Sequence, residues 1–186
     1  MRQRLTTRDL LTCAVLGVAT AVLMIAIAPT TAVVAAVSPP AYALIAGYSV
    51  IAPLLALRLM ERSGVATITA FCCAIVTWPF TALGLLVFIA LVGPAIAMDL
   101  AFLLRRRLGT GRAVWVSAGV GAIVIFFLSL PVFSPDHLTA TILTLTLIAR
   151  LASYALACWI ALLLARALRA AGIARRTPTK SPRPRR

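Results

Sequence analysis

Long uncharged runs separated by short basic clusters are the dominant pattern of the chain. The first run covers residues 10–57 without a single charge, and as a helix rising 1.5 Å per residue it would be about 70 Å long. The hydrocarbon core of a bilayer is about 30 Å thick, so this run has to turn back. Proline interrupts the helical hydrogen-bond ladder, and Pro29 with the Ser-Pro-Pro sequence at 38–40 places the turn. The pattern predicts one membrane span over 10–28 and a second over 41–57.

The connection between these two spans, residues 30–37, is unusual for a loop. It is apolar and rich in Ala and Val rather than polar. It fits a lid lying over the bundle, a re-entrant piece, or an extension of the first helix, and the pattern leaves these three alternatives open.

The remaining apolar runs predict four further spans. Between residues 65 and 104 Asp99 is the only charge, and a helix of that length would be about 60 Å long, enough for two crossings. Trp78-Pro79 and Gly84 place the turn between these two. The four spans are predicted over residues 65–80, 83–104, 114–133 and 138–165.

The predicted fold class is an all-α membrane protein, a bundle of six transmembrane helices within residues 10–171. Strands are not a serious alternative, because the apolar runs are continuous and lack the alternation of a membrane barrel. Residues 1–9 form a basic N-terminal segment, and the Pro-rich basic tail at 172–186 is expected to be disordered. The composition agrees: 62% of residues are hydrophobic and 12% charged, whereas soluble domains have about 25% charged residues.

The distribution of charge predicts the orientation of the bundle. The chain has 18 Lys and Arg against 4 Asp and Glu, a formal net charge of +14, which alone would suggest nucleic-acid binding. The basic residues instead cluster at 2–8, 58–62, 105–112 and 166–186, all on one side of a six-span bundle. The positive-inside rule then places both termini in the cytoplasm, with the clusters facing anionic lipids. No nucleic-acid partner is expected.

Arg150 is the one basic residue deep inside a predicted span, where a charge costs about 2.5–3.5 kcal/mol on insertion scales. Polar and small residues recur on its helical face at spacings of three, four and seven, so the stripe is expected to point into the bundle. One interpretation is that Arg150 binds an anionic or carbonyl-bearing ligand in a pocket open to the outer side. The other is a structural Arg that bonds backbone carbonyls or extends toward the interface. The other members of the stripe are Thr139, Thr146, Ser153 and Ala157.

Asp99 is the one acidic residue inside a predicted span. It lies about five residues from the basic cluster at Arg105, whereas Arg150 lies about 15 residues from its own cytoplasmic end, a depth difference of about 15 Å. A direct pair between Asp99 and Arg150 is therefore not expected. We expect Asp99 to pair with arginines at the inner mouth of the bundle, in a structural or coupling role; a proton relay is the alternative.

Small residues recur every four positions in the first span, at Cys13, Gly17 and Ala21. Such a face lets another helix backbone approach closely. The approaching helix belongs either to the same bundle or to a separate membrane subunit that docks there, and the pattern fits both.

Aromatic and polar side chains gather near the predicted outer ends of the spans. Their rings are suited to stacking on a heterocycle, although interfacial anchoring explains them equally well. The chain has no phosphate-binding Gly loop, no Ser or Cys nucleophile with a His base, and no zinc-protease motif. We therefore expect no enzyme activity, metal or cofactor, and energy from ATP would have to come from another polypeptide. The residues at the outer ends are Tyr42, Tyr48, Trp78, Phe80, Asp136 and His137.

With these features, the chain resembles the S component, the substrate-capture membrane subunit, of energy-coupling-factor (ECF) vitamin transporters. The resemblance covers about residues 8–172: six spans within 186 residues, a short basic N-terminus before LLTCAVLGVATAVL, and a long apolar first outer connection. It also rests on the stretches SPPAYALIAGYSVIAPLLALRLMERSGVATITAF and LVGPAIAMDLAFLLRRRLG, with a short cytoplasmic turn at 61–64.

The resemblance implies a multi-pass protein of the bacterial plasma membrane that holds a vitamin or related small molecule in the outer half of its bundle. It also implies docking on a membrane coupling subunit driven by two ATPase subunits. Aromatic residues make up only 7% of the chain, so the vitamin itself is left open. The implied docking residues are Cys13, Gly17 and Ala21. The implied ligand-binding residues are Arg150, Tyr154, Thr146, Trp78, Tyr42, Asp136 and His137.

Two other functions fit the same spans. One is a six-span scaffold resembling the rod-shape-determining membrane proteins, which would assemble partners and bind no solute. The other is a small proton-coupled carrier with Asp99 as its relay. A pocket open to the outer side around Arg150 favours solute binding, whereas a filled core there favours the scaffold.

Overall fold

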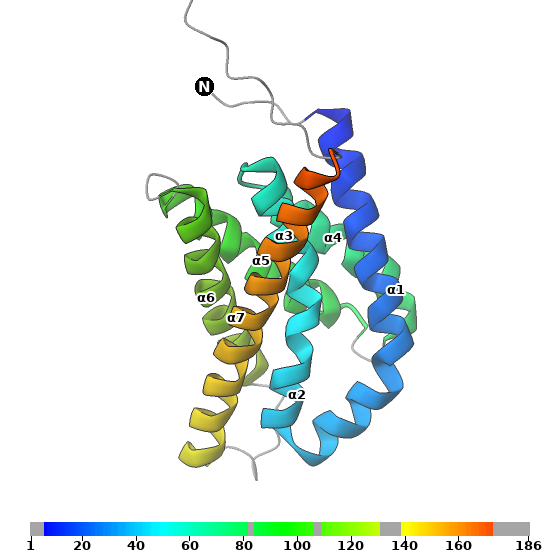
Figure 1. Ribbon diagram of the computed structural model, residues 1–186. Coiled ribbons are helices and arrows are strands. Elements are labelled where there is room, and N and C mark those ends of the chain that lie inside the picture. Colours follow the sequence, from blue (N-terminus) through cyan, green and yellow to red (C-terminus); the bar gives the residue numbers. More distant parts are fainter. Residues whose placement is uncertain (1–5, 82–83, 106–108, 131–138, 173–186) are drawn as a thin grey trace, which may run out of the picture.

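The computed structural model describes residues 6–81, 84–105, 109–130 and 139–172. All regular elements in these ranges are helical, and Figure 1 shows them packed into one elongated bundle. The predicted all-α class is confirmed. The α-helices are α1 (Thr7–Val37), α2 (Pro39–Ile45), α3 (Ile51–Met60), α4 (Val65–Thr77), α5 (Leu86–Arg105), α6 (Thr110–Ser129) and α7 (Ala140–Ala170), and the 3₁₀-helices are η1 (Ala46–Val50) and η2 (Trp78–Phe80).

Five helical segments of the described chain are long and apolar enough to cross a membrane. They are Thr7–Ala35, Pro39–Met60, Leu86–Leu104, Thr110–Ser129 and Ala140–Ala170. The second of them joins α2, η1 and α3 into one span. The remaining predicted crossing, Val65–Phe80, is apolar but shorter, so a count of six crossings stays a prediction.

Helix α1 continues beyond its expected end at residue 28. It runs through Pro29 to Val37, so residues 30–37 extend the first helix, one of the three alternatives. The hydroxyl of Thr31 donates to the carbonyls of Ile27 and Ala28, next to the proline. Such back-bonding and a proline both bend helices. Figure 1 shows the end of α1 curving under the bundle toward α2.

The small-residue face of α1 packs against α4 inside the bundle. Cys13 is 1% exposed and Ala21 is fully buried. At Gly17 an added Cβ would lie 2.5 Å from the carbonyl oxygen of Thr69 and 3.1 Å from the backbone nitrogen of Cys73. This face packs against the protein's own α4, which favours the first of the two alternatives, a helix of the same bundle. The spacing was correct for close helix contact, but a repeat of small residues does not identify the helix that makes the contact.

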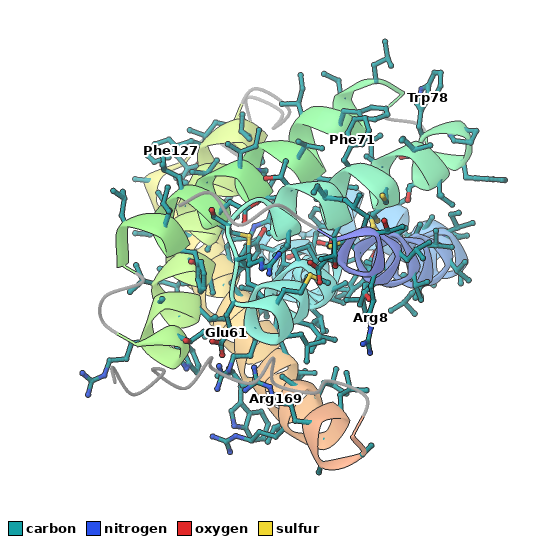
Figure 2. All side chains as sticks on the ribbon, turned by 90° about the horizontal axis from the view of Figure 1, so that it is seen from above. Arg8, Glu61, Phe71, Trp78, Phe127 and Arg169 are labelled. Carbon is teal, nitrogen blue, oxygen red and sulfur yellow. The ribbon has the colours of Figure 1, made fainter. Side chains whose placement is uncertain are left out.

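Ion pairs join the helices at the end of the bundle where α1 begins (Figures 1 and 2). Glu61, in the connection between α3 and α4, pairs with Arg58 at 2.8 Å and with Arg169 of α7 at 3.3 Å. Arg62 pairs with Asp9 of α1 at 3.1 Å. The described basic residues outside Arg150 thus gather at one end, as the positive-inside argument requires.

Asp99 is 7% exposed and binds the first turn of α4. Its carboxylate accepts hydrogen bonds from the hydroxyl of Thr67 at 2.6 Å, the backbone N–H of Thr67 at 2.8 Å and that of Ala66 at 3.4 Å. The N-cap residue of α4, Gly64, has no side chain to do this. Asp99 therefore caps α4 from α5, where its negative charge complements the helix dipole. This bonding replaces the expected arginine pairing among the described side chains; those of residues 105–108 lie outside them.

Replacing Asp99 with Ala should lower the stability of the protein by about 2 kcal/mol or more, because it removes charge-assisted hydrogen bonds and a helix cap. Asp99→Asn should lose less, since the amide oxygen still accepts. Thermal unfolding in detergent measures both. Leu100→Ala, at the next and 55% exposed position of α5, is the matched control, and a loss there equal to that of Asp99→Ala would contradict the capping role.

Candidate functional site

A cavity of about 660 Å³ lies in the half of the bundle remote from the ion pairs. Its walls come from the C-terminal part of α1, from α2, η1 and the start of α3, from the end of α4 and η2, from α5 as far as Met98, from the end of α6 and from α7. Most lining side chains are apolar. The principal polar ones are Thr31, Tyr42, Tyr48, Ser49, Arg150 and Tyr154. Pockets of this volume and composition bind small organic molecules.

Arg150 is the charged group of this cavity. It is 4% exposed, and its Nε atom has no hydrogen-bond partner among the described residues. Its guanidinium carbon lies 5.9 Å from the ring centroid of Tyr42, a cation–π contact. A buried charge without a hydrogen-bonded partner is costly. The guanidinium therefore retains donors that a ligand with acceptor atoms is able to satisfy.

The face of α7 that carries Arg150 points into the bundle, as its spacing predicted. Tyr154 is 3% exposed and lines the cavity one turn further along the helix. Ser153 and Ala157 are also buried. The exception in the stripe is Thr139, which is exposed at the N-cap of α7.

The structure brings together three of the predicted ligand-binding residues, Arg150, Tyr154 and Tyr42, around the cavity. Thr146 is fully buried but does not line it; its hydroxyl donates to the carbonyl of Ile142 in its own helix at 2.7 Å. Trp78 is 47% exposed at the periphery (Figure 2), with its ring centroid 6.3 Å from that of Phe88, and it is not part of the wall. The two remaining residues, Asp136 and His137, lie outside the described ranges.

Several wall residues were not among the predicted ligand-binding set. Met24 comes from the predicted part of α1, Thr31 comes from α1 because that helix continues past the proline, and Ser49 comes from the 3₁₀ segment η1. Tyr48 and Phe80 also line the cavity, and both belong to the aromatic residues near the outer ends of the spans. Sequence periodicity misses Ser49 because a 3₁₀ turn changes which side chains face inward.

A bundle of membrane-length helices with a solute-sized cavity in one half is typical of membrane proteins that bind small molecules. The chain matches, over residues 8–125, the family model described as "ABC-type cobalt transport system, permease component". It belongs to this family, whose members are transporter components rather than enzymes.

A solved structure described as an S-component of an ECF transporter has the same fold. The similarity has a TM-score of 0.79 at 19% sequence identity, and it covers 92% of this chain and 89% of the other. Together with the family match, it confirms the resemblance to S components stated from the sequence. No curated protein matches the chain.

Proposed function

We propose that this chain is the substrate-capture subunit of an ECF-type ABC importer and binds a vitamin or related small molecule in the cavity around Arg150. The observation that carries the proposal is the buried guanidinium, without a hydrogen bond at Nε, in the wall of a mostly apolar cavity of about 660 Å³. The donors of Arg150 suit a carbonyl, ring nitrogen or anionic group, and the Tyr42 ring suits a flat heterocycle.

The composition of the wall supports an organic cargo over a bare metal ion. Arg150 is the one charged side chain among the described residues of the wall, and its positive charge repels a cation. The described residues contain no group of three or more His, Cys, Asp or Glu side chains placed to hold a metal. The cobalt in the family's description therefore finds no ligand set in this part of the chain.

The proposal includes partners, because the chain has no nucleotide-binding motif of its own. A membrane coupling subunit with two ATPase subunits would supply the energy, in the plasma membrane of a bacterium. Since α4 covers Cys13, Gly17 and Ala21, such a subunit would contact other surfaces. The exposed arginines at the N-terminal end, such as Arg112 and Arg166, are suited to anionic lipids.

The two alternative functions have less support. A cavity rather than a filled core surrounds Arg150, which argues against a pure scaffold. Asp99 is outside the cavity wall and accepts hydrogen bonds from the start of α4, which argues against a proton relay along a solute path.

The direct test is to purify the protein in mild detergent from cells that express it, denature it, and identify the released small molecule by mass spectrometry. We expect a stoichiometric organic compound with hydrogen-bond acceptors. Parallel purification of Arg150→Met should yield the folded protein without that compound. A preparation in which neither protein carries a compound, and in which added vitamins do not raise the unfolding temperature, would contradict the proposal.

The orientation predicted from the charges is tested by cysteine labelling from outside whole cells. In a background in which the four native cysteines are replaced, Thr139→Cys at the start of α7 should react with an impermeant maleimide. Arg112→Cys, exposed near the start of α6, should react only after the cells are opened, because basic clusters face the cytoplasm. The reverse pattern of labelling would invert the topology.

A further inference from the structure

Ser153 connects α7 to a different helix beside the cavity. Its hydroxyl donates to the backbone carbonyl of Leu44 in α2. By contrast, the buried hydroxyls of Ser117 and Thr146 donate to carbonyls of their own helices. Leu44 lies at the junction between α2 and η1, where the change from α to 3₁₀ geometry interrupts the regular hydrogen-bond ladder. Ser153 thus supplies a donor at a place where the backbone needs one.

Gly47 brings the two backbones into contact at the same point. It is the second residue of η1 and is buried. An added Cβ would overlap the Ser153 hydroxyl and would lie 2.8 Å from the Ser153 carbonyl oxygen. Only a residue without a side chain allows η1 to lie this close to α7. The Ser153–Leu44 hydrogen bond and the Gly47 contact therefore form one clamp between α7 and the α2–η1 segment.

This clamp lies three residues along α7 from Arg150 and two residues along α2 from Tyr42. Helix α2 has seven residues and is joined to α3 only through the 3₁₀ segment η1, so its position relative to α7 depends on what it packs against. Tyr42 in turn supplies the cation–π contact to Arg150, whose Nε has no hydrogen bond to hold it. A long, flexible side chain without such bonds is oriented mainly by the ring over which it lies.

We propose that Ser153 is a positioning residue of the binding site: by holding the Leu44 carbonyl it fixes α2, so that the Tyr42 ring orients the Arg150 guanidinium toward the cavity. Ser153 acts through Tyr42 and need not touch the ligand. The proposal rests on the proposed function only in treating the cavity as the binding site.

The reactivity of Arg150 toward phenylglyoxal, an arginine-selective reagent, tests this without any ligand. The rate is measured on the purified protein by mass spectrometry of the peptide that contains Arg150. Ser153→Ala should raise the rate by about 2- to 30-fold, the range that corresponds to loss of a cation–π contact. Tyr42→Ala should raise it similarly, and the double variant should react no faster than the faster single variant, because both changes remove the same restraint.

Ser117→Ala is the matched control, since Ser117 is a buried membrane-helix serine whose hydroxyl bonds its own helix at 2.9 Å. It should leave the Arg150 rate unchanged. An unchanged rate in Ser153→Ala, effects that multiply in the double variant, or an equal rise in Ser117→Ala would each overturn the proposal. If Ser153→Ala is not recovered folded, Ser153→Cys retains a weak donor and should show a smaller rise; no rise in that variant would count against the clamp. If the phenylglyoxal rates contradict the role of Ser153, the proposed substrate capture is not affected. If the Arg150→Met comparison contradicts substrate capture, the phenylglyoxal rates still test the role of Ser153.

Discussion

Replacing Gly17 with Leu should prevent the protein from accumulating in a folded form. The Cβ alone would lie 2.5 Å from the carbonyl oxygen of Thr69 and 2.9 Å from the Cβ of Cys72, and a Leu side chain adds three more carbons. Two of the three nearest atoms are backbone atoms of α4, which have no rotamer to change. The helices α1 and α4 would have to separate, at a cost of about 3 kcal/mol or more.

The measurement is the yield of monodisperse protein after detergent extraction, together with its unfolding temperature. Gly119→Leu is the matched control, because Gly119 lies within membrane helix α6 and an added Cβ there meets nothing within 4 Å. We expect near-normal yield for Gly119→Leu and little folded protein for Gly17→Leu. Gly17→Leu protein that folds normally but fails to bind a coupling subunit would instead support docking of that subunit on this face.

Replacing Arg150 with Met should have opposite effects on binding and on stability. Ligand affinity should fall by about 10- to 150-fold, corresponding to about 1.5–3 kcal/mol for hydrogen bonds to a charged group. The unfolding temperature of the ligand-free protein should stay the same or rise, because Met removes a buried charge whose Nε lacks a partner and fills similar space. Arg150→Lys should also bind poorly, since an ammonium lacks the planar fork of the guanidinium.

Affinity is measured with the compound identified by mass spectrometry, and stability by thermal unfolding without it. Arg112→Met serves as the control, because Arg112 is exposed at the opposite end of the bundle, and it should change neither quantity. A large loss of stability in Arg150→Met with unchanged affinity would assign Arg150 a structural role.

The sequence predicted the bounds of a helix well where the length of an uncharged run sets them, and less well where a single residue such as Pro29 was expected to end the helix. The bilayer thickness and the uncharged runs were enough to place α5, α6 and α7 to within a few residues. Pro29 was misread as a terminator because a proline removes one hydrogen bond, and within an apolar environment the rest of the helix compensates for that loss. The continuation of α1 is what adds Thr31, Ala32 and Ala35 to the wall of the cavity.

The sequence was enough to predict the charged residue of the candidate site, Arg150, but not most of the residues that line the cavity around it. Arg150 is recognisable from the sequence because a charge within a membrane span is energetically costly and usually functional. The helical period places Tyr154 on the same face of the helix. Which neighbours surround it depends on how helices pair, and no periodicity contains that information. The small-residue face at Gly17 illustrates the same limit, since the spacing indicated a close contact but not that α4 makes it.

The shortness of α4 has a consequence for the lipid around the protein. With 13 residues in α4 and three in η2, this segment spans about 26 Å, less than a hydrocarbon core of about 30 Å. Helices α1 and α7, with 31 residues each, are long enough to exceed it. If α4 is the sixth crossing predicted above, the bilayer beside it would thin by about 4 Å or flanking side chains would extend to the interface, at a cost of fractions of a kcal/mol per Å. Hydrophobic mismatch of this kind would favour lipids with shorter acyl chains beside α4, so membrane thickness would act on a helix that contributes to the wall of the cavity.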